Sequence, residues 1–230
     1  MFILYPLASI NFIYMAAAVV PAIILLKYIY ELDEVEHEPK SLLGRLLIGG
    51  MACIIPAIAL EWLANMIIGP GNSRFHYFIE AFFGVALIEE GCKFFALKKI
   101  SFDAPSFDYR FDGIVYAVFV SLGFAILENI KYVYLGGIST AFVRALTSIP
   151  GHMSFAIPMG IFFANAKRKQ LAHRPYTLDF AIGLVLSIIF HGIYDYVLMV
   201  NDNMSFVLVI IVIYLILFTL TLVEKKDEHL

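Results

Sequence analysis

The chain is predicted to be an all-α membrane protein, a polytopic bundle of about seven transmembrane helices. Of its 230 residues, 61% are hydrophobic and only 15% are charged, and the mean hydropathy is +0.86. A soluble domain would be roughly half apolar and a quarter charged. The composition therefore predicts a lipid bilayer as the surroundings. The net charge of -3 gives no reason to expect a nucleic-acid partner.

Seven apolar stretches approach the length of about 20 residues that a spanning helix needs. They cover Ser9–Tyr30, Leu46–Ile68, Phe75–Leu97, Phe111–Leu135, Ala141–Ala166, Leu178–Val200 and Ser205–Val223. Glycine-rich turns at 69–71 and 136–137 separate two pairs of neighbouring stretches. The first stretch lacks a basic leader and a small-residue cleavage site, so we expect a retained anchor rather than a signal peptide.

The lysines and arginines predict an orientation. Most of the sixteen lie in or beside alternate connections on one side of the predicted bundle, whereas Arg74 alone lies in the connections of the other side. The first group comprises Lys27, Lys40, Arg45, Lys98, Lys99, Arg110, Lys167, Arg168, Lys169, Arg174, Lys225 and Lys226. Because basic residues are retained on the cytoplasmic side, we expect an external N-terminus and a cytoplasmic C-terminus.

The sequence predicts a single membrane-embedded domain over residues 1–230. It contains no fixed-period repeat, and no connection between apolar stretches is long enough for a second domain of ordinary size. Cys53 and Cys92 both fall in apolar stretches, where we expect reduced thiols that pack as small hydrophobes. Nothing in the sequence specifies an oligomeric state.

Charged residues in the third apolar stretch form the motif Glu89-Glu90-x-x-Lys93. One charge at the centre of a membrane helix costs roughly 2.5–3.5 kcal/mol, so the group needs partners or a function. Lys93 can neutralise either glutamate, but adjacent side chains diverge by about 100° and cannot both face it equally well. We expect one glutamate to face a cavity; the alternative is an ion pair that only eases insertion. Glu61 and Glu80 are solitary and are interpreted as structural hydrogen-bonding groups.

The fourth stretch carries Glu128-Asn129, after a Gly123-Phe124 pair that permits close helix packing. Glu128 is a candidate functional carboxylate, because Lys131 lies closer to the external interface and is expected to snorkel away from it. Asn129 could donate a hydrogen bond to a substrate carbonyl or simply tie two helices together.

The fifth and sixth stretches add further polar groups. His191 and Asp195 lie one helical turn apart, so that Asp195 could orient the imidazole. The fifth stretch contains Arg144 and the run Pro150-Gly151-His152. We expect a helix break at the Pro-Gly step, with His152 either lining the site or satisfying the freed backbone groups.

Together these motifs resemble the PrsW family of intramembrane proteases. The resemblance covers about residues 75–200 and depends on the order and spacing of four motifs. They are Glu89-Glu90-x-x-Lys93, the Phe111-Asp112-Gly113 entry to Gly123-Phe124-x-x-x-Glu128-Asn129-x-x-Tyr132, Arg144 with Pro150-Gly151-His152, and His191-Gly192-x-Tyr194-Asp195. A more distant similarity is to the CAAX prenyl endopeptidases, which have histidine at the place of Glu128 and asparagine at the place of Asp195.

The resemblance implies an endopeptidase in which a glutamate activates water without a covalent intermediate. From the residues themselves we expect no metal and no other cofactor. It implies a single-span membrane protein as substrate, such as an anti-sigma factor cut near the external face, and the cell membrane of a prokaryote as the location. Peptide hydrolysis needs a general base, oxyanion donors and an acid for the leaving amine.

Those needs lead to a set of roles. We expect Glu89 or Glu90 as the base, Glu128 as a second carboxylate, His191 and Asn129 as oxyanion donors, and Asp195 orienting His191. Supporting or substrate-binding residues are Lys93, Arg144, His152 and Asn129. In straight helices with ~1.5 Å of rise per residue, Glu89 would lie ~21 Å below the external end, against ~10 Å for Glu128 and ~13 Å for His191. The helices must therefore tilt or bend.

Two other functional classes fit the same residues. Glutamate, histidine and aspartate are ligands of zinc, so a metal-dependent membrane protease is one alternative, although Lys93 would disfavour a cation beside the glutamates. A proton-coupled transporter is the other, because membrane-buried carboxylates and histidines form proton relays; it is disfavoured by the lack of an internal repeat. A scaffold for other membrane helices would leave the polar groups unexplained.

Overall fold

The structure is a computed structural model that describes residues 12–200, 206–207, 209–211, 213–214, 217 and 228–230. Its elements are α1 (Phe12–Leu32), α2 (Lys40–Ala52), α3 (Ile54–Ile68), α4 (Arg74–Ile79), the π-helix η1 (Glu80–Ala86), α5 (Leu87–Ser101), α6 (Arg110–Leu146), α7 (Ser148–Leu171) and α8 (Thr177–Val200). The predicted all-α class is confirmed. Within the described residues, the β-structure consists of an isolated bridge between Tyr109 and His229.

Four stretches of the described residues are long and apolar enough to cross a membrane: Phe12–Leu32, Lys40–Ile68, Arg110–Leu171 and Thr177–Val200. The 62-residue stretch comprises both α6 and α7. The predicted spans over 75–97 and 205–223 are not among the four. The first of these carries the Glu89, Glu90 and Lys93 charges, and most of the second lies outside the described residues.

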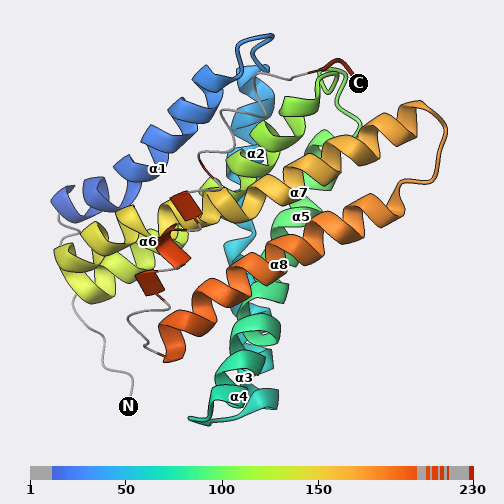
Figure 1. Ribbon diagram of the computed structural model, residues 1–230. Coiled ribbons are helices and arrows are strands. Elements are labelled where there is room, and N and C mark those ends of the chain that lie inside the picture. Colours follow the sequence, from blue (N-terminus) through green and yellow to red (C-terminus); the bar gives the residue numbers. More distant parts are fainter. Residues whose placement is uncertain (1–11, 201–205, 208, 212, 215–216, 218–227) are drawn as a thin grey trace.

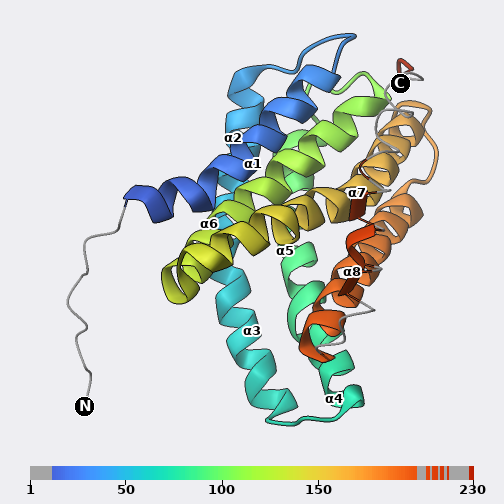
Figure 2. The ribbon, with the colours of Figure 1, turned by 60° about the vertical axis from the view of Figure 1, so that its left-hand side comes forward.

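Helices α6 and α7 form the centre of the protein and run antiparallel to each other (Figure 1). In the α6–α7 stretch, 83% of the residues of an apolar 18-residue segment are buried within the protein. In the corresponding segments of α1, α2–α3 and α8, only 17%, 22% and 33% are buried. Helix α1 packs on α6, and α8 packs on α7. Helices α3 and α4 lie at one end of the molecule, away from the α6–α7 pair (Figure 2), and α4 also packs against α8 there. The outer helices are therefore left with wide apolar faces, as expected for contact with lipid.

Glycines allow the backbones to approach closely where helices cross α6. A Cβ atom on Gly50 of α2 would collide with the carbonyl oxygen of Val120, and one on Gly123 of α6 would collide with that of Leu47. Gly113 of α6 and Gly160 of α7 lie against each other's backbones in the same way. The close approach predicted at Gly123 is thus confirmed, and it fixes how deeply α2 and α7 pack against α6.

The predicted break at Pro150-Gly151 is wrong. Helix α7 begins at Ser148, so Pro150 lies in its first turn, where a backbone N–H has no partner within the helix and proline is tolerated. Breaks occur instead at Gly137 (φ 76°) and at Thr147, the residue between α6 and α7. Both residues precede α7, so His152 lies within the helix. Its side chain is buried in the protein interior.

The segment from α4 to α5 is continuous but changes its winding. Residues Glu80–Ala86 form a π-helix, η1, between α4 and α5. A π-helix is wider than an α-helix and shifts the faces of the residues that follow it, and it is frequent at functional sites. The glutamate pair Glu89-Glu90 lies in the first turn of α5, directly after this wider segment.

The crossing of α2 and α6 gives a stability prediction with an internal control. Gly50→Ala should lower the free energy of unfolding by roughly 1–3 kcal/mol, because the new methyl group meets rigid backbone. Gly44→Ala is the same change on the same helix, with open space around the new atom, and should be neutral or stabilising by up to ~1 kcal/mol. Thermal unfolding of both variants in detergent would check this; equal midpoints would contradict the packing described.

Candidate active site

The ammonium group of Lys93 lies at the centre of a buried polar cluster. Its Nζ donates to Glu89 Oε2 at 3.1 Å and to Glu90 Oε1 at 2.8 Å, and it lies 3.3 Å from His152 Nδ1. We expected that the two glutamates could not face Lys93 equally well, yet both are within hydrogen-bonding distance of its Nζ. The two contacts at i+3 and i+4 are both short because Lys93 is long enough to place its Nζ between the adjacent side chains. The third contact of Lys93, with His152, comes from α7.

Phe124 supports the same ammonium from α6. Lys93 Nζ lies 4.2 Å from the centre of the Phe124 ring, a cation–π contact that is strongest when it is shielded from water. Lys93 is 1% exposed, and Phe124 is fully buried. All three N–H donors of Lys93 thus have an acceptor, and its remaining side faces an aromatic ring.

His191 of α8 is held by carboxylates on two helices. Its Nδ1 lies 2.9 Å from Glu90 Oε1, and its Nε2 lies 3.4 Å from Asp195 Oδ2 and 3.9 Å from Glu89 Oε2. The ring also stacks on Phe155 of α7, with centroids 4.9 Å apart and planes 15° apart. The predicted pairing of His191 with Asp195 is present, and Glu90 supplies a second contact that fixes the imidazole.

Glu128 is the centre of a second group, on α6 and α7. Its Oε2 accepts a hydrogen bond from Arg144 Nη2 at 2.7 Å and lies 2.9 Å from His152 Nε2. His152 therefore connects the two groups, with Nδ1 next to Lys93 and Nε2 next to Glu128. Because Lys93 can only donate, His152 Nδ1 accepts and its Nε2 carries the proton toward Glu128. Arg144 also packs over the Tyr132 ring, 4.2 Å from its centre.

Asn129 has a different position from the other predicted residues. Its amide nitrogen donates to the carbonyl oxygen of Ala18 in α1 at 2.6 Å, and its oxygen accepts from Arg144 Nε at 2.8 Å. The residue is fully buried and does not line the cavity described next. Of the two expectations for Asn129, the structure shows the tie between helices.

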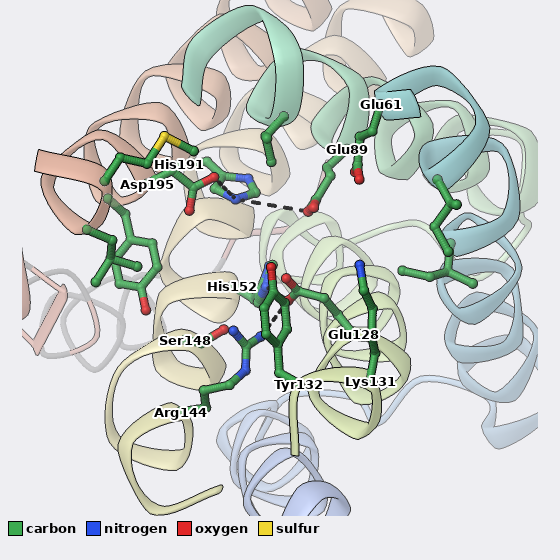
Figure 3. A pocket seen from close by; sticks show the side chains of 16 residues that line it. Glu61, Glu89, Glu128, Lys131, Tyr132, Arg144, Ser148, His152, His191 and Asp195 are labelled. Atoms are coloured by element: carbon green, nitrogen blue, oxygen red, sulfur yellow. Dashed lines mark hydrogen bonds and ion pairs between the residues drawn. The ribbon is translucent and has the colours of Figure 1, made fainter. Parts of the chain in front are cut away.

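A cavity of about 330 Å³ opens beside these groups (Figure 3). Among the predicted residues, its wall includes Glu89, Glu128, Arg144, His152, His191 and Asp195. Glu90 and Lys93 lie behind the wall. In Figure 3, Glu89, His191 and Asp195 lie on one side of the cavity, and Glu128, Arg144 and His152 lie opposite. The cavity thus has a carboxylate on each of two facing walls.

Several residues of the wall were not expected there. Glu61 of α3 faces this cavity, whereas the sequence suggested a structural role, and Lys131 lines it instead of turning away. Tyr132, Ser148 and Tyr194 also line it. A charge inside an apolar stretch was the available signal for Glu61, but the face of α3 that meets α5 cannot be known before the helices are placed.

The fold and this cluster define a helical membrane protein with a polar site between its helices. A family model described as "PrsW family intramembrane metalloprotease" matches residues 38–221. Similar curated proteins include the protease PrsW of Oceanobacillus iheyensis, 33% identical, with 94% of this chain and 96% of that protein covered. Those of Geobacillus kaustophilus and Bacillus subtilis are 34% and 31% identical, covering 83% and 93% of this chain and 82% and 95% of their own lengths.

The chain therefore belongs to the PrsW family of intramembrane proteases. Membership indicates that it is a peptidase. No solved structure matches the chain.

The description of the family raises the question of whether these residues fit a metal ion. In the site, Glu89, Glu90 and His152 offer ligand atoms within 4.8 Å of one another. Those three side chains are the ones that contact Lys93 Nζ, at 3.1, 2.8 and 3.3 Å. A divalent cation would have to replace an ammonium that already satisfies these ligand atoms. In this arrangement the cluster fits the ammonium and does not fit a metal ion.

The central place of Lys93 gives a second stability prediction. Lys93→Met should lower the free energy of unfolding by about 3–5 kcal/mol, because it leaves two buried carboxylates without their cation. Lys93→Met combined with Glu90→Gln should recover part of that loss. Lys27→Met is the control, since the Lys27–Glu31 pair is exposed (72% and 63% for the two side chains) and should be worth less than ~1 kcal/mol. Unfolding in detergent measures all three; similar losses for Lys93→Met and Lys27→Met would contradict this account.

Proposed function

We propose that this protein is an intramembrane endopeptidase in which Glu89 activates water to hydrolyse a peptide bond of a membrane-anchored protein. The observation that carries the proposal is the placement of Glu89 and His191 on the wall of one cavity, with Glu128 and Arg144 on the opposite wall. A peptide carbonyl between the walls would have a carboxylate base on one side and a cationic donor on the other.

Burial distinguishes the two adjacent glutamates. Glu89 reaches the cavity, whereas Glu90 is fully buried and contacts Lys93 and His191. A general base must reach the proton that it removes. We therefore assign the base to Glu89 and give Glu90 the task of orienting His191 through Nδ1, alongside Asp195 at Nε2.

The reaction then has a simple proton balance. Glu89 takes one proton from water as the water oxygen bonds to the carbonyl carbon, and the carbonyl oxygen becomes an oxyanion. Collapse of that intermediate breaks the C–N bond, and the proton passes to the leaving amine. His191 Nε2 faces Glu89 and Asp195 and is placed to stabilise the oxyanion or to relay the proton. Lys93 offsets the negative charge of the glutamate pair throughout.

The opposite wall has a positioning task. Glu128 is engaged by His152 and Arg144, so it is a second carboxylate that holds these groups rather than a free base. Asn129 was expected as an oxyanion donor; its bonds to Ala18 and Arg144 support a role in holding Arg144 at the cavity instead. Arg144 is the cationic donor on this wall.

The proposed substrate is a single-span membrane protein, such as an anti-sigma factor. Apolar side chains of Ile54, Ile58, Leu198 and Met199 share the cavity wall with the polar groups, as a segment leaving the bilayer would require. The relatives named above are bacterial proteins, which supports a multi-pass location in a bacterial cell membrane.

The proposed topology has seven spans and an external N-terminus, and it can be tested by labelling. After replacement of Cys53 and Cys92 by serine, a cysteine at Asn72, in the α3–α4 connection, should react in intact cells with a membrane-impermeant thiol reagent. A cysteine at Lys40, the exposed first residue of α2, should react only after the membrane is opened, since the positive-inside bias retains the α1–α2 connection in the cytoplasm. The reverse pattern would invert the topology.

The catalytic assignment is tested by cleavage of single-span substrates in liposomes. Glu89→Gln should lower the cleavage rate by roughly 10²–10⁴-fold, since it removes the base without changing the size of the side chain. Glu80→Gln is the matched control: Glu80 contacts His76 at 3.4 Å, does not line this cavity, and its loss should leave the rate within about twofold.

Two results would contradict the proposal in different ways. Normal cleavage by Glu89→Gln would remove Glu89 as the base. Cleavage by the wild type that disappears with chelator and returns with one metal would show that the glutamates act as ligands, and that Lys93 moves away during the reaction. Chelator-resistant cleavage that is lost in Glu89→Gln is the expected result.

A further inference from the structure

A second group of acidic residues lies at the other end of α6 from the cavity. Glu38 comes from the connection between α1 and α2, Asp108 from the connection between α5 and α6, and Asp112 from the first turn of α6. Sixteen residues of helix separate Asp112 from Glu128, which corresponds to ~24 Å. None of the three lines the cavity, and the proposed hydrolysis does not use them.

These three carboxylates converge. Each offers one oxygen, and the three oxygens lie within 4.8 Å of one another. Glu38 is 3% exposed and Asp112 is fully buried, while Asp108 is partly exposed. Like charges at such spacing repel one another strongly when water is excluded, so the arrangement requires something that offsets them.

One carboxylate oxygen of this group of residues is buried without a partner. Asp112 Oδ2 accepts hydrogen bonds from the backbone nitrogens of Asp108 and Tyr109, at 3.0 and 2.7 Å. Among the residues that the structure describes, Asp112 Oδ1 has no hydrogen-bond partner and no exposure to solvent. An unpaired buried carboxylate oxygen is costly, and native proteins normally satisfy it with a donor, water or an ion.

Few positively charged groups of the described residues lie close enough to neutralise these three carboxylates. Within the described residues, the ion pair that these three carboxylates form is the one between Asp108 and His229, at 4.0 Å. Glu38 instead accepts a hydrogen bond from the hydroxyl of Tyr116. By contrast, the glutamate pair of the active site has Lys93 at its centre. The glutamate pair thus contains an ammonium group that would exclude a metal cation, whereas no lysine or arginine of the described residues forms an ion pair with Glu38, Asp108 or Asp112.

We propose that Glu38, Asp108 and Asp112 bind a hard divalent cation, Ca²⁺ or Mg²⁺. Carboxylate oxygens are the ligands that these ions prefer, and water completes their coordination where the protein leaves positions open. The orphaned oxygen of Asp112 and the half-exposed Asp108 would supply a buried ligand and a route of entry. The ion would join the α1–α2 connection to the start of α6, the helix that carries Glu128 at its middle.

The rival explanation is a shared proton. Burial raises the pKa of Glu38, so a carboxyl group in this cluster could remain neutral and donate to its neighbour. Protonation and cation binding compete for the same oxygens, and they differ in what they need: the first responds only to pH, whereas the second responds to the concentration of the cation.

The test uses Tb³⁺, a luminescent probe for calcium sites, with the full-length protein in detergent. Tyr116 bonds to Glu38, so a Tb³⁺ ion at this site would lie beside a phenol ring that can sensitise its emission. We expect saturable emission that Ca²⁺ or Mg²⁺ displaces. Glu38→Gln and Asp112→Asn should each weaken binding at least tenfold, and both retain a side-chain oxygen for the local hydrogen bonds. Glu36→Gln, an exposed acid in the same connection, should bind as the wild type does.

A second measurement is the thermal midpoint with CaCl₂ or MgCl₂, compared with NaCl at equal ionic strength. The divalent salts should raise the midpoint of the wild type and of Glu36→Gln but not that of Glu38→Gln. Equal Tb³⁺ binding by Glu38→Gln, Asp112→Asn and Glu36→Gln would overturn the proposal. A lack of Tb³⁺ binding by the wild type would also overturn the proposal and leave the shared proton as the explanation. Neither measurement uses cleavage, so the outcome is independent of the proposed protease reaction.

Discussion

The polar site depends on the buried ammonium of Lys93. Its three hydrogen-bonding contacts are to Glu89, Glu90 and His152, and each of these leads to a further element of the site. Glu90 contacts His191 of α8, and His152 contacts Glu128, which holds Arg144. A single charge therefore links α5, α6, α7 and α8. In an apolar bundle such a network is demanding, because removing one charged partner leaves the others buried and uncompensated.

The helices reach this common point from different depths, which straight parallel helices could not do. Helices α3 and α4 lie at one end of the molecule (Figure 2), and the continuous segment that leads from α4 to Glu89 begins at that end. The π-helix η1 lies directly before α5, which carries Glu89. Helix α6 has a kink at Gly137, and Thr147 separates it from α7. The close backbone contacts at Gly50 and Gly123 set the distance between α2 and α6.

The site also shows how this chain accommodates its differences from the prenyl endopeptidases that it distantly resembles. It has Glu128 where they have histidine, but an imidazole is present nearby, since His152 of α7 lies 2.9 Å from Glu128. It has Asp195 where they have asparagine, and that carboxylate lies beside His191. Glu128 is paired with the guanidinium group of Arg144, and Asp195 contacts the imidazole of His191.

The sequence by itself determined the helical class and the family, and it identified the polar residues to which we assign the chemistry. These follow from composition, from charges inside apolar stretches and from the spacing of motifs, all of which are local properties. Only the tertiary structure decided that Glu89 faces the cavity and Glu90 lies behind it, that Lys93 contacts both, and that Glu61 joins the wall. The rotation of each helix about its axis depends on the glycine contacts and on the π-helix. Asn129 shows the same limit, since its partners lie on α1 and at Arg144, and no spacing within one helix could have identified them.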